Sequence, residues 1–413
     1  MSKLEELIAQ LCPNGVEYKT LGEIAIDVFR GAGIKRDEVT EEGIPCVRYG
    51  EIYTTYGVWF DECVSHTVLE NVASPKYFEN GDILFAITGE SVEDIAKSCA
   101  YVGHEKCLAG GDIVVLKHNQ NPKYLAYALS TTDAQMQKSK GKVKSKVVHS
   151  SVPAIKEIVV PIPPLPVQSE IVRILDNFTE LTAELTAELT ARQSQYEYYA
   201  SNMFPSIKKA DVKWIELGEV ATVTKLAGFE FTKYVTYSDA GNIIALRGLN
   251  VKNGHLVLDD VKYIDNSNLE MLSRSKLRIG DMLFTYVGTV GQVALIQEND
   301  KYYLAPNVAL VRITDERFLP EYMMYYFLTD KFKQEQIAKL LQASSMQNIP
   351  MEKIRKFKLP LISIEEQRKT IDILNRFDTL CNDISAGLPA EIEARQKQYE
   401  YYRDRLLTFE PAK

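Results

Sequence analysis

Residues 192–199 have the sequence Arg-Gln-Ser-Gln-Tyr-Glu-Tyr-Tyr, and residues 395–402 repeat it as Arg-Gln-Lys-Gln-Tyr-Glu-Tyr-Tyr. Only the third residue of this octet differs. Because a tyrosine-rich string of this length rarely recurs by chance, the two octets indicate that the chain contains two tandem copies of one unit. The simpler alternative is an old duplication in which the copies have no functional difference.

Shorter strings support the duplication. The matched strings are Leu21–Ala25 with Leu217–Ala221, Gly81–Phe85 with Gly280–Phe284, and Ile174–Phe178 with Ile373–Phe377. Between these strings the two halves differ strongly. A constant frame with variable segments between its parts predicts one scaffold that presents two different recognition surfaces.

Composition is that of an ordinary soluble protein. The 413 residues are 46% hydrophobic and 25% charged, and no apolar run approaches the roughly 18–20 residues of a membrane span. Residues 1–8 are amphipathic and acidic, unlike a signal peptide. The six cysteines form no CxxC pair, so we expect neither a disulfide framework nor a metal site, and a cytoplasmic location.

The net charge of −8 argues mildly against a small nucleic-acid-binding module, but one stretch is basic. Residues 137–149 contain five lysines and no acid. These lysines are Lys138, Lys140, Lys142, Lys144 and Lys146. In an extended segment their alternate spacing would place all five ammonium groups on one side, as a ridge that contacts phosphates. The alternative is an edge strand protected by lysines.

Residues 1 to about 163 have the pattern of a mixed α/β domain. Short apolar runs at 83–87 and 113–116 predict strands, and the sequence after Pro122 predicts a helix start. Four prolines within residues 161–166 then exclude both helix interior and central strand, so they mark a domain edge. The counterpart in the second half is 359–361.

A long helical pattern follows each proline-containing edge. From residue 171 to 189, and again from 371 to 384, apolar residues recur at spacings of three and four, which is the period of one helix face. We expect the two helices to pack antiparallel as a coiled-coil spacer. Gly387 and Pro389 predict a break in the second. The sequence thus divides into 1–163, 164–205, 206–361 and 362–413.

The first helical pattern contains the tandem repeat Thr-Ala-Glu-Leu within residues 182–191. Four residues turn a helix by about 400° and lengthen it by about 6 Å, so whole repeats can be added without turning the leucine stripe to solvent. We offer the hypothesis that this segment is a ruler between two DNA-recognising domains. The alternative is a good helix-forming seam and nothing more.

The sequence contains no recognisable catalytic motif. It lacks a phosphate-binding GxxxxGK[ST] loop, a GxGxxG string after a strand, and a convincing cluster of nuclease carboxylates. The five histidines are scattered without metal-ligand spacing. A chain of this length without such motifs is more consistent with a binding or adaptor subunit than with an enzyme.

These features together resemble the specificity subunit of a type I restriction–modification enzyme, and most closely the branch whose central helix carries TAEL repeats. The resemblance covers the whole chain. It rests on the octets, the Leu-Gly-Glu strings, Glu366-Gln367-Arg368 followed by Ile373-Leu374, and the TAEL run. The first copy departs from the pattern, with Gln168-Ser169-Glu170 in place of Glu-Gln-Arg.

The resemblance implies a non-catalytic subunit that recognises a bipartite double-stranded DNA target. Its fold would be α+β, with two mixed α/β target recognition domains in a tandem pseudo-symmetric repeat, separated by the two helices. Two methyltransferase subunits would bind the helices, and restriction subunits would join to form an ATP-dependent endonuclease. S-adenosylmethionine and ATP would belong to those partners, so this chain would hold no cofactor. The segment 402–407 would lie beside the N-terminal helix that contains Leu4, Leu7, Ile8 and Leu11.

Candidate DNA-binding residues follow from matched positions after strands and in glycine-containing turns. Arginine is the commonest reader of the guanine edge, and small residues let a base edge approach closely. Besides the five lysines, the candidates are Arg48, Tyr49, Thr88, Ser91, Arg247, Thr289, Gln347 and Asn348. Salt bridging or turn chemistry is the alternative explanation for each.

Candidate partner-binding residues lie in the octets, because aromatic residues with polar tips favour interfaces. These candidates are Gln195, Tyr196, Tyr199, Gln398, Tyr399 and Tyr402. Alternatively, the tyrosines pack only on their own domain or on the sister helix. The runner-up function is a two-headed protein adaptor with a rigid spacer and no role on DNA.

Overall fold

The computed structural model divides the chain into two compact units. Unit 1 comprises Met1–Leu185 and Ile392–Lys413, and unit 2 comprises Thr186–Glu391. The residues that the structure describes are 3–140, 147–205, 212–226, 228–341, 348–382 and 387–413.

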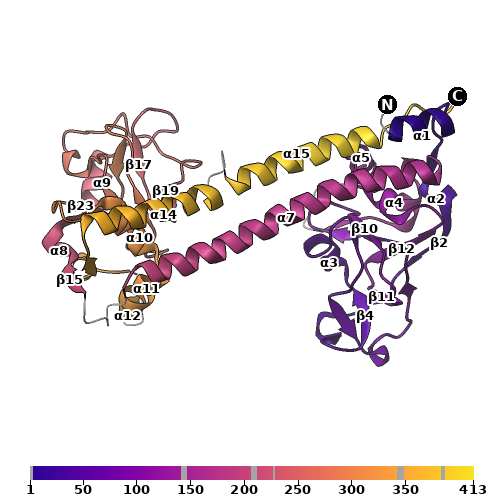
Figure 1. Cartoon of the computed structure of the whole chain (residues 1–413), viewed down its shortest axis with the longest axis horizontal. Helices are drawn as coiled ribbons and strands as arrows, with labels where there is room; N and C mark the ends of the chain where they lie inside the picture. Colours follow the sequence, from indigo (N-terminus) through magenta and orange to yellow (C-terminus); the bar gives the residue numbers. More distant parts are fainter. Residues whose placement is uncertain (1–2, 141–146, 206–211, 227, 342–347, 383–386) are drawn as a thin grey trace. The chain divides into compact units, whose positions relative to one another are not determined.

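Unit 1 is built on a five-stranded sheet in which strands β8 (Ile83–Ala86) and β10 (Ser98–Tyr101) are buried on both faces. Its strand order is β2 (Ala25–Arg30), β12 (Ile113–His118), β8, β10 and β5 (Trp59–Phe60). Strand β8 is completely buried, and helix α4 (Pro122–Leu129) packs against it and β10 (Figure 1). The strands at 83–87 and 113–116 and the helix start at Pro122 were predicted correctly.

A second sheet in unit 1 carries the start of a candidate site. Its order is β3 (Val39–Thr40), β6 (Ser65–Thr67), β4 (Ile44–Val47), β11 (Cys107–Ala109) and β7 (Tyr77–Phe78). Strand β4 runs parallel to β11, with Val47 opposite Ala109. Helix α3 (Tyr49–Thr54) begins directly after β4, so the sheet fixes the position of Arg48 at the helix N-cap.

Unit 2 repeats both arrangements. Its main sheet has the order β16 (Ala221–Lys225), β23 (Val308–Ile313), β20 (Met282–Thr285) and β21 (Val293–Leu295), and strand β17 (Ile244–Leu246) runs parallel to β22 (Tyr302–Leu304). Helix α10 (Pro320–Leu328) packs against β21 as α4 packs against β10. The predicted pair of mixed α/β domains is confirmed.

The Leu-Gly-Glu strings form the same corner in both units. Helices α2 (Leu21–Ile24) and α8 (Leu217–Val220) each have a glutamate at their third position that accepts a hydrogen bond from the N-cap backbone. Each follows a short strand paired with the strand before the long helix. The pairs are β1 (Tyr18–Thr20) with β14 (Val159–Pro161) and β15 (Lys213–Glu216) with β24 (Lys358–Leu361).

Helix α7 (Leu165–Met203) is continuous over 39 residues, as the periodicity predicted. Pro166 lies in its first turn, where a proline removes no helical hydrogen bond. At its other end the Lys331 ammonium donates to the carbonyl oxygens of Ser201 (2.6 Å) and Phe204 (2.7 Å). A cation at a helix C-terminus satisfies unpaired carbonyls and opposes the helix dipole.

The second helical pattern is described as two helices, α14 (Ile364–Asn382) and α15 (Leu388–Leu406). Pro389 therefore lies in the first turn of α15, as the predicted break requires. In unit 2, Tyr199 of α7 contacts Phe377, whereas Tyr196 packs against both Phe377 and the neighbourhood of Cys381. Tyr196, which comes earlier in α7 than Tyr199, thus lies near the later residue of α14. The two helices are therefore antiparallel there.

The two ends of the chain meet in unit 1. Val16 donates its backbone N–H to the Glu410 carbonyl and accepts from Ala412, both at 2.9 Å, and the Tyr18 hydroxyl donates to the Phe409 carbonyl at 3.0 Å. Leu4 of helix α1 (Lys3–Leu11) shares a core with Leu407 (Figure 1). The predicted neighbourhood of the C-terminal segment and the N-terminal helix is confirmed.

Candidate nucleic-acid interface

A groove of about 670 Å³ opens beside Arg48 in unit 1. We call it groove 1. It is formed by the N-terminal end of α3, the loop before 3-10 helix η1 (Arg36–Glu38), and the turn between β11 and β12. Its lining residues are Gly33, Ile34, Lys35, Arg36, Arg48, Tyr49, Gly50, Glu51, Thr54, Gly110, Gly111 and Asp112. The candidates Arg48 and Tyr49 therefore lie together in one concave surface.

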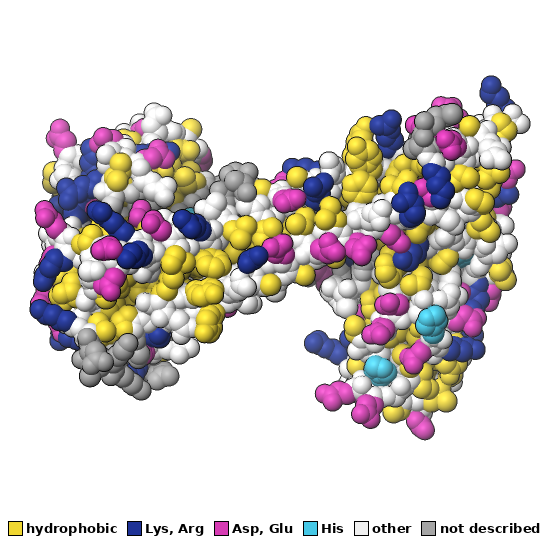
Figure 2. Space-filling model, in the orientation of Figure 1, with side chains coloured by type: hydrophobic (Ala, Val, Ile, Leu, Met, Phe, Trp, Pro, Cys, Tyr) yellow, Lys and Arg dark blue, Asp and Glu magenta, His cyan; other side chains and the backbone are white. Residues whose placement is uncertain are grey.

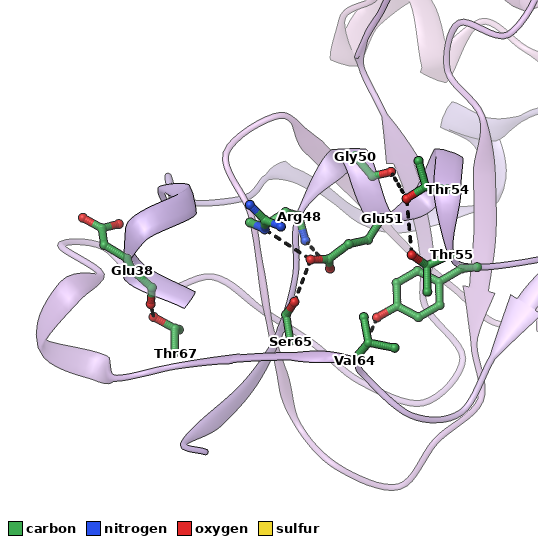
Figure 3. Close-up of polar contacts among 10 residues, drawn as sticks. Glu38, Arg48, Gly50, Glu51, Thr54, Thr55, Val64, Ser65 and Thr67 are labelled. Atoms are coloured by element: carbon green, nitrogen blue, oxygen red, sulfur yellow. Dashed lines mark hydrogen bonds and ion pairs between the residues drawn. The ribbon is translucent and has the colours of Figure 1, made fainter. Parts of the chain in front are cut away.

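Arg48 is held by Glu51, one helical turn away. The Glu51 carboxylate accepts from the Arg48 backbone N–H at 3.0 Å and from its Nε at 3.2 Å. The Ser65 hydroxyl donates to the same carboxylate at 2.7 Å (Figure 3). Because Glu51 is buried and fixed by a second strand, it orients the arginine.

Unit 2 has a groove of about 420 Å³ at the equivalent place, which we call groove 2. Equivalence follows from register, because Leu246 stands opposite Leu304 as Val47 stands opposite Ala109. The lining residues are Phe231, Tyr237, Arg247, Gly248, Leu249, Thr285, Val287, Thr289, Pro306 and Asn307. Groove 2 thus brings the candidates Arg247 and Thr289 together.

Arg247 has other hydrogen-bond partners than Arg48. Its backbone N–H donates to Asn250 Oδ1 at 3.1 Å, but Nη2 donates to both the carbonyl and the carboxylate of Asp260, each at 2.8 Å. The Arg247 Nε atom is buried without a hydrogen-bond partner among the described residues. Asn250 replaces the buried glutamate of unit 1, so the two copies differ in the chemistry around the matched arginine.

The turns after the Gly-Asp strands pair with the segments that contain His149 and Asn348. Thr88 pairs with His149, and their side chains are 3.2 Å apart. Val287 forms the equivalent bridge with Asn348. The correspondence inferred between His149 and Asn348 is therefore seen in the pairing. Gln347 itself lies outside the described residues.

Two further turn candidates make local contacts. The Ser91 hydroxyl donates to the Glu93 carboxylate at 2.6 Å, which is turn chemistry. The Thr289 carbonyl accepts from the Thr285 hydroxyl at 2.5 Å, and this bond shapes the turn at the edge of groove 2. The side chain of Ser91 does not line groove 1.

The predicted lysine ridge is wrong at Lys138. This residue lies in helix α5 (Thr132–Ser139) and not in an extended segment, because Thr131 caps a new helix by accepting from the Ala134 backbone N–H. Its ammonium is buried, donating to the Leu129 carbonyl at 2.7 Å and to Ser98 at 3.3 Å. Burial lowers the pKa of Lys138 to about 7. Lys140 is exposed.

The predicted ridge also included three other lysines of residues 137–149. Lys142, Lys144 and Lys146 lie outside the described residues.

The octet tyrosines pack largely within the protein. Tyr399 is buried against Tyr127, with ring centroids 6.4 Å apart, and Tyr402 stacks on Phe178 at 5.5 Å. Tyr196 and Tyr199 both contact Phe377. The alternative of intramolecular packing therefore describes Tyr399 and Tyr196, whereas Tyr199 and Tyr402 keep exposed fractions of 45% and 38%.

The octet glutamines are exposed, and each is oriented by its own octet. Arg192 donates to Gln195 at 3.0 Å, and Arg395 donates to Gln398 at 3.1 Å. The two octets therefore present the same side-chain pair on their surfaces.

Comparison with known proteins identifies the architecture. The family model of the type I restriction modification DNA specificity domain matches the chain twice, over residues 13–192 and 209–394. The chain belongs to this family.

Two relatives of the specificity subunit show the extent of the similarity. A putative type I restriction enzyme specificity subunit of Haemophilus influenzae is 32% identical over 279 residues, which cover 65% of this chain and 68% of the relative. The EcoR124I/EcoR124II specificity subunit of Escherichia coli is 32% identical over 306 residues, or 70% of each chain.

Solved structures agree on the fold. A chain from a study of complex assembly and conformational transition in a type I restriction–modification system has a TM-score of 0.65, at 15% identity, covering 96% of this chain and 98% of that one. The S subunit of M. genitalium has a TM-score of 0.53, at 14% identity, covering 95% and 96%. At these identities the likeness concerns the fold alone.

The protein is thus a specificity subunit that recognises DNA with two domains, and catalysis lies in other subunits of the system. The alternative of a protein adaptor without a DNA role finds no support. Among the described residues, no group of three or more His, Cys, Asp or Glu side chains is arranged to hold a metal ion. In the same residues, no helix is long and apolar enough to cross a membrane.

Several residues of the specificity subunit's surfaces were not singled out from sequence. Tyr198 and Tyr401, the seventh residues of the octets, are 66% and 60% exposed. Their exposure could have been predicted from the sequence. A helix that turns residues 5 and 8 of the octet inward turns residue 7 away from them. Glu51 was also detectable, three positions after Arg48, as a helix-capping acid.

Proposed function

We propose that groove 1 contacts one half of a bipartite DNA target and groove 2 contacts the other half. The observation that carries this proposal is the pair of grooves at equivalent places, each beside an arginine that follows a parallel strand. A duplicated scaffold with unlike linings suits a target whose halves differ in sequence. The other candidates of the two turns, Thr88 and Asn348, would also contact bases or phosphates, and Asn348 pairs with Val287, which lines groove 2.

DNA binding by this chain must come from local charge, because the net charge is −8. On the faces seen in Figure 2, acidic and basic side chains are interspersed on both units. Groove 1 is lined by Lys35, Arg36 and Arg48, and Lys140, one of the five lysines of residues 137–149, is exposed. Such cations would contact phosphates in a salt-dependent manner.

The long helices would set the distance between the two half-sites, and the chain would belong to the branch of the family whose central helix carries TAEL repeats. Within α7, Glu184 and Glu188 are exposed, whereas Leu185 and Leu189 are half-buried. This pattern supports a helix that packs by its leucine stripe and keeps its acidic face away from DNA. Each repeat would then act as a unit of length.

The octets would bind the methyltransferase subunits, one at each octet. The exposed pairs Tyr198–Tyr199 and Tyr401–Tyr402 have rings in edge contact at 5.6 and 5.3 Å. Two nearly identical aromatic surfaces favour two copies of one partner. Restriction subunits would join this complex in the cytoplasm. Within it, S-adenosylmethionine and ATP would be bound by the partners.

The test is long-read detection of N6-methyladenine in the native host, with and without the gene. The expected result is loss of one split motif that is methylated on both strands. If the partner genes are expressed and the methylome does not change, the proposal is wrong.

A further inference from the structure

The matched arginines of the two grooves differ in which nitrogen atoms are already engaged. In groove 1, Glu51 binds the backbone N–H and Nε of Arg48. Within the part of the chain that the structure describes, neither Nη1 nor Nη2 of Arg48 has a protein partner. In groove 2, Asp260 occupies Nη2 of Arg247 with two acceptors.

The carboxylate that holds Arg48 is itself fixed. Glu51 is 6% exposed, and Ser65 of β6 donates to it from a strand that pairs with β4. Figure 3 shows Arg48 and Ser65 converging on this carboxylate from different elements. An arginine held through Nε loses little further freedom when it binds, so its planar end is preoriented.

Groove 1, which Arg48 lines, has open space at two of its glycines. A Cβ atom added at Gly33 or at Gly50 would have no neighbour within 4 Å, and both residues line groove 1. The Arg48 side chain keeps 31% of its surface exposed. Because Arg48 itself lines groove 1, the edge of a flat ligand that enters the groove can reach its side chain.

We propose that Arg48 recognises a guanine through two parallel hydrogen bonds from Nη1 and Nη2 to O6 and N7, and that Glu51 is the residue that positions it. A terminal guanidinium edge with two free donors matches this pair of acceptors, which the major groove presents only at guanine. The inference rests on the proposed function, in which groove 1 contacts DNA.

Arg247 has a different role from Arg48. Asp260 is an exposed carboxylate, with 66% of its side chain accessible, and it forms an ion pair with Nη2 of Arg247. Arg247 thus braces the loop between Asn250 and Asp260, which Asn250 also holds by donating to the Asp260 carbonyl at 2.8 Å. Groove 2 therefore contains no free guanidinium edge from Arg247.

The test measures the sequence preference of the complex with its methyltransferase subunits on DNA whose first half-site is randomised. Arg48→Lys keeps a positive charge but loses the planar fork, so discrimination at a single guanine should fall about ten- to a hundredfold. Glu51→Gln should reduce discrimination at the same guanine, by a smaller factor, without changing the dependence of affinity on salt. Arg173→Lys is the matched control, because this exposed arginine is also held by a carboxylate three residues away but lines neither groove, and it should leave the guanine preference intact.

Two results would overturn the inference while the proposed function stands. If Arg48→Ala weakens binding to every sequence equally and reduces the salt slope by about one, Arg48 contacts a phosphate. If Arg48→Lys and Arg48→Ala both leave the preference unchanged, Arg48 does not contact DNA. Arg36→Glu separates the two proposals, because unchanged affinity in that variant as well would remove groove 1 from the DNA interface.

Discussion

The ring of Tyr402 stacks on the ring of Phe178, with centroids 5.5 Å apart and planes inclined by 25°. In the other unit, Tyr199 stacks on Phe377 at 5.6 Å and 30°. By the repeat, Phe178 corresponds to Phe377 and Tyr199 corresponds to Tyr402. Each copy's phenylalanine thus receives the tyrosine of the other copy's octet, so neither half of the sequence completes its own unit.

This exchange predicts matched effects on stability. Phe178→Ala should lower the free energy of unfolding of unit 1 by about 1–3 kcal/mol, less than a fully buried phenylalanine because the side chain is half-buried. A double-mutant cycle with Tyr402→Ala should give a coupling of about 0.5–1.5 kcal/mol. Chemical denaturation measures both, and Phe377→Ala, which belongs to unit 2, is the control expected to show no coupling with Tyr402→Ala.

A second prediction concerns the buried glutamine in each long helix. The Gln168 side chain accepts from the Asn121 backbone N–H (3.0 Å) and donates to the Pro163 carbonyl (2.7 Å). Gln168→Leu leaves both backbone groups unpaired, so unfolding should become easier by about 2–4 kcal/mol. Thermal unfolding detects the change. An unaltered melting temperature would show that water replaces the amide.

Gln367 offers a replicate of that experiment. It accepts from Leu319 at 2.9 Å and donates to the Arg317 and Ile362 carbonyls. Gln367→Leu should therefore cost about the same amount as Gln168→Leu, about 2–4 kcal/mol.

Lys138 predicts a pH dependence of stability in unit 1. Gln137 and Gln336 make the same backbone contacts, so Lys138 corresponds to Ile337, which is buried in unit 2. Burial lowers the Lys138 pKa from 10.5 to about 7 in the folded state. Between these values the unfolded chain binds more protons, so wild-type stability should rise with pH across pH 7–10.5.

The variant Lys138→Ile tests this sign. It should be more stable than wild type by a few kcal/mol, about 2–4, below pH 7, and the advantage should shrink towards pH 10.5. Denaturant unfolding at pH 6.5 and 9.5 provides the comparison. A gain that does not depend on pH would mean that the buried lysine keeps its proton as the unfolded chain does, so that burial does not lower its pKa.

The octet surfaces predict the composition of the complex. Tyr198→Ala together with Tyr401→Ala should reduce the number of bound methyltransferase subunits, because these side chains are the exposed members of each pair. Native mass spectrometry counts the subunits. Ser194→Ala, on the same helix as Tyr198, is the control. Two bound subunits in the double tyrosine variant would exclude these side chains as the contact.

The TAEL run predicts a change of target. One added repeat within residues 182–191 lengthens the helix by about 6 Å, so the methylated motif should keep both half-sites and gain bases between them. Sequencing of N6-methyladenine gives the spacing directly. An unchanged spacing would refute the ruler hypothesis.

The sequence predicted those parts of the fold that depend on local pattern. The repeats predicted the two domains, and the spacing of apolar residues predicted α7. Gly387 and Pro389 predicted the break before α15. It failed where tertiary context decides. The alternate lysines predicted an extended ridge, but Thr131 caps a helix that turns Lys138 inward. The grooves were only partly predictable, because Asp260 reaches Arg247 from a loop 13 residues away, a distance at which no local pattern operates.

The pairing of Val16 with residues 410–412 has a consequence for biosynthesis. Unit 2 is one continuous segment of the chain, whereas unit 1 needs residues from both ends. A ribosome therefore delivers every residue of the second unit before the first unit has its last helix and closing bridge. The domain that is translated first cannot complete its fold until translation ends. Contacts between distant segments form only after both segments exist. Premature termination near the C-terminus would thus damage the domain made earliest and spare the one made later.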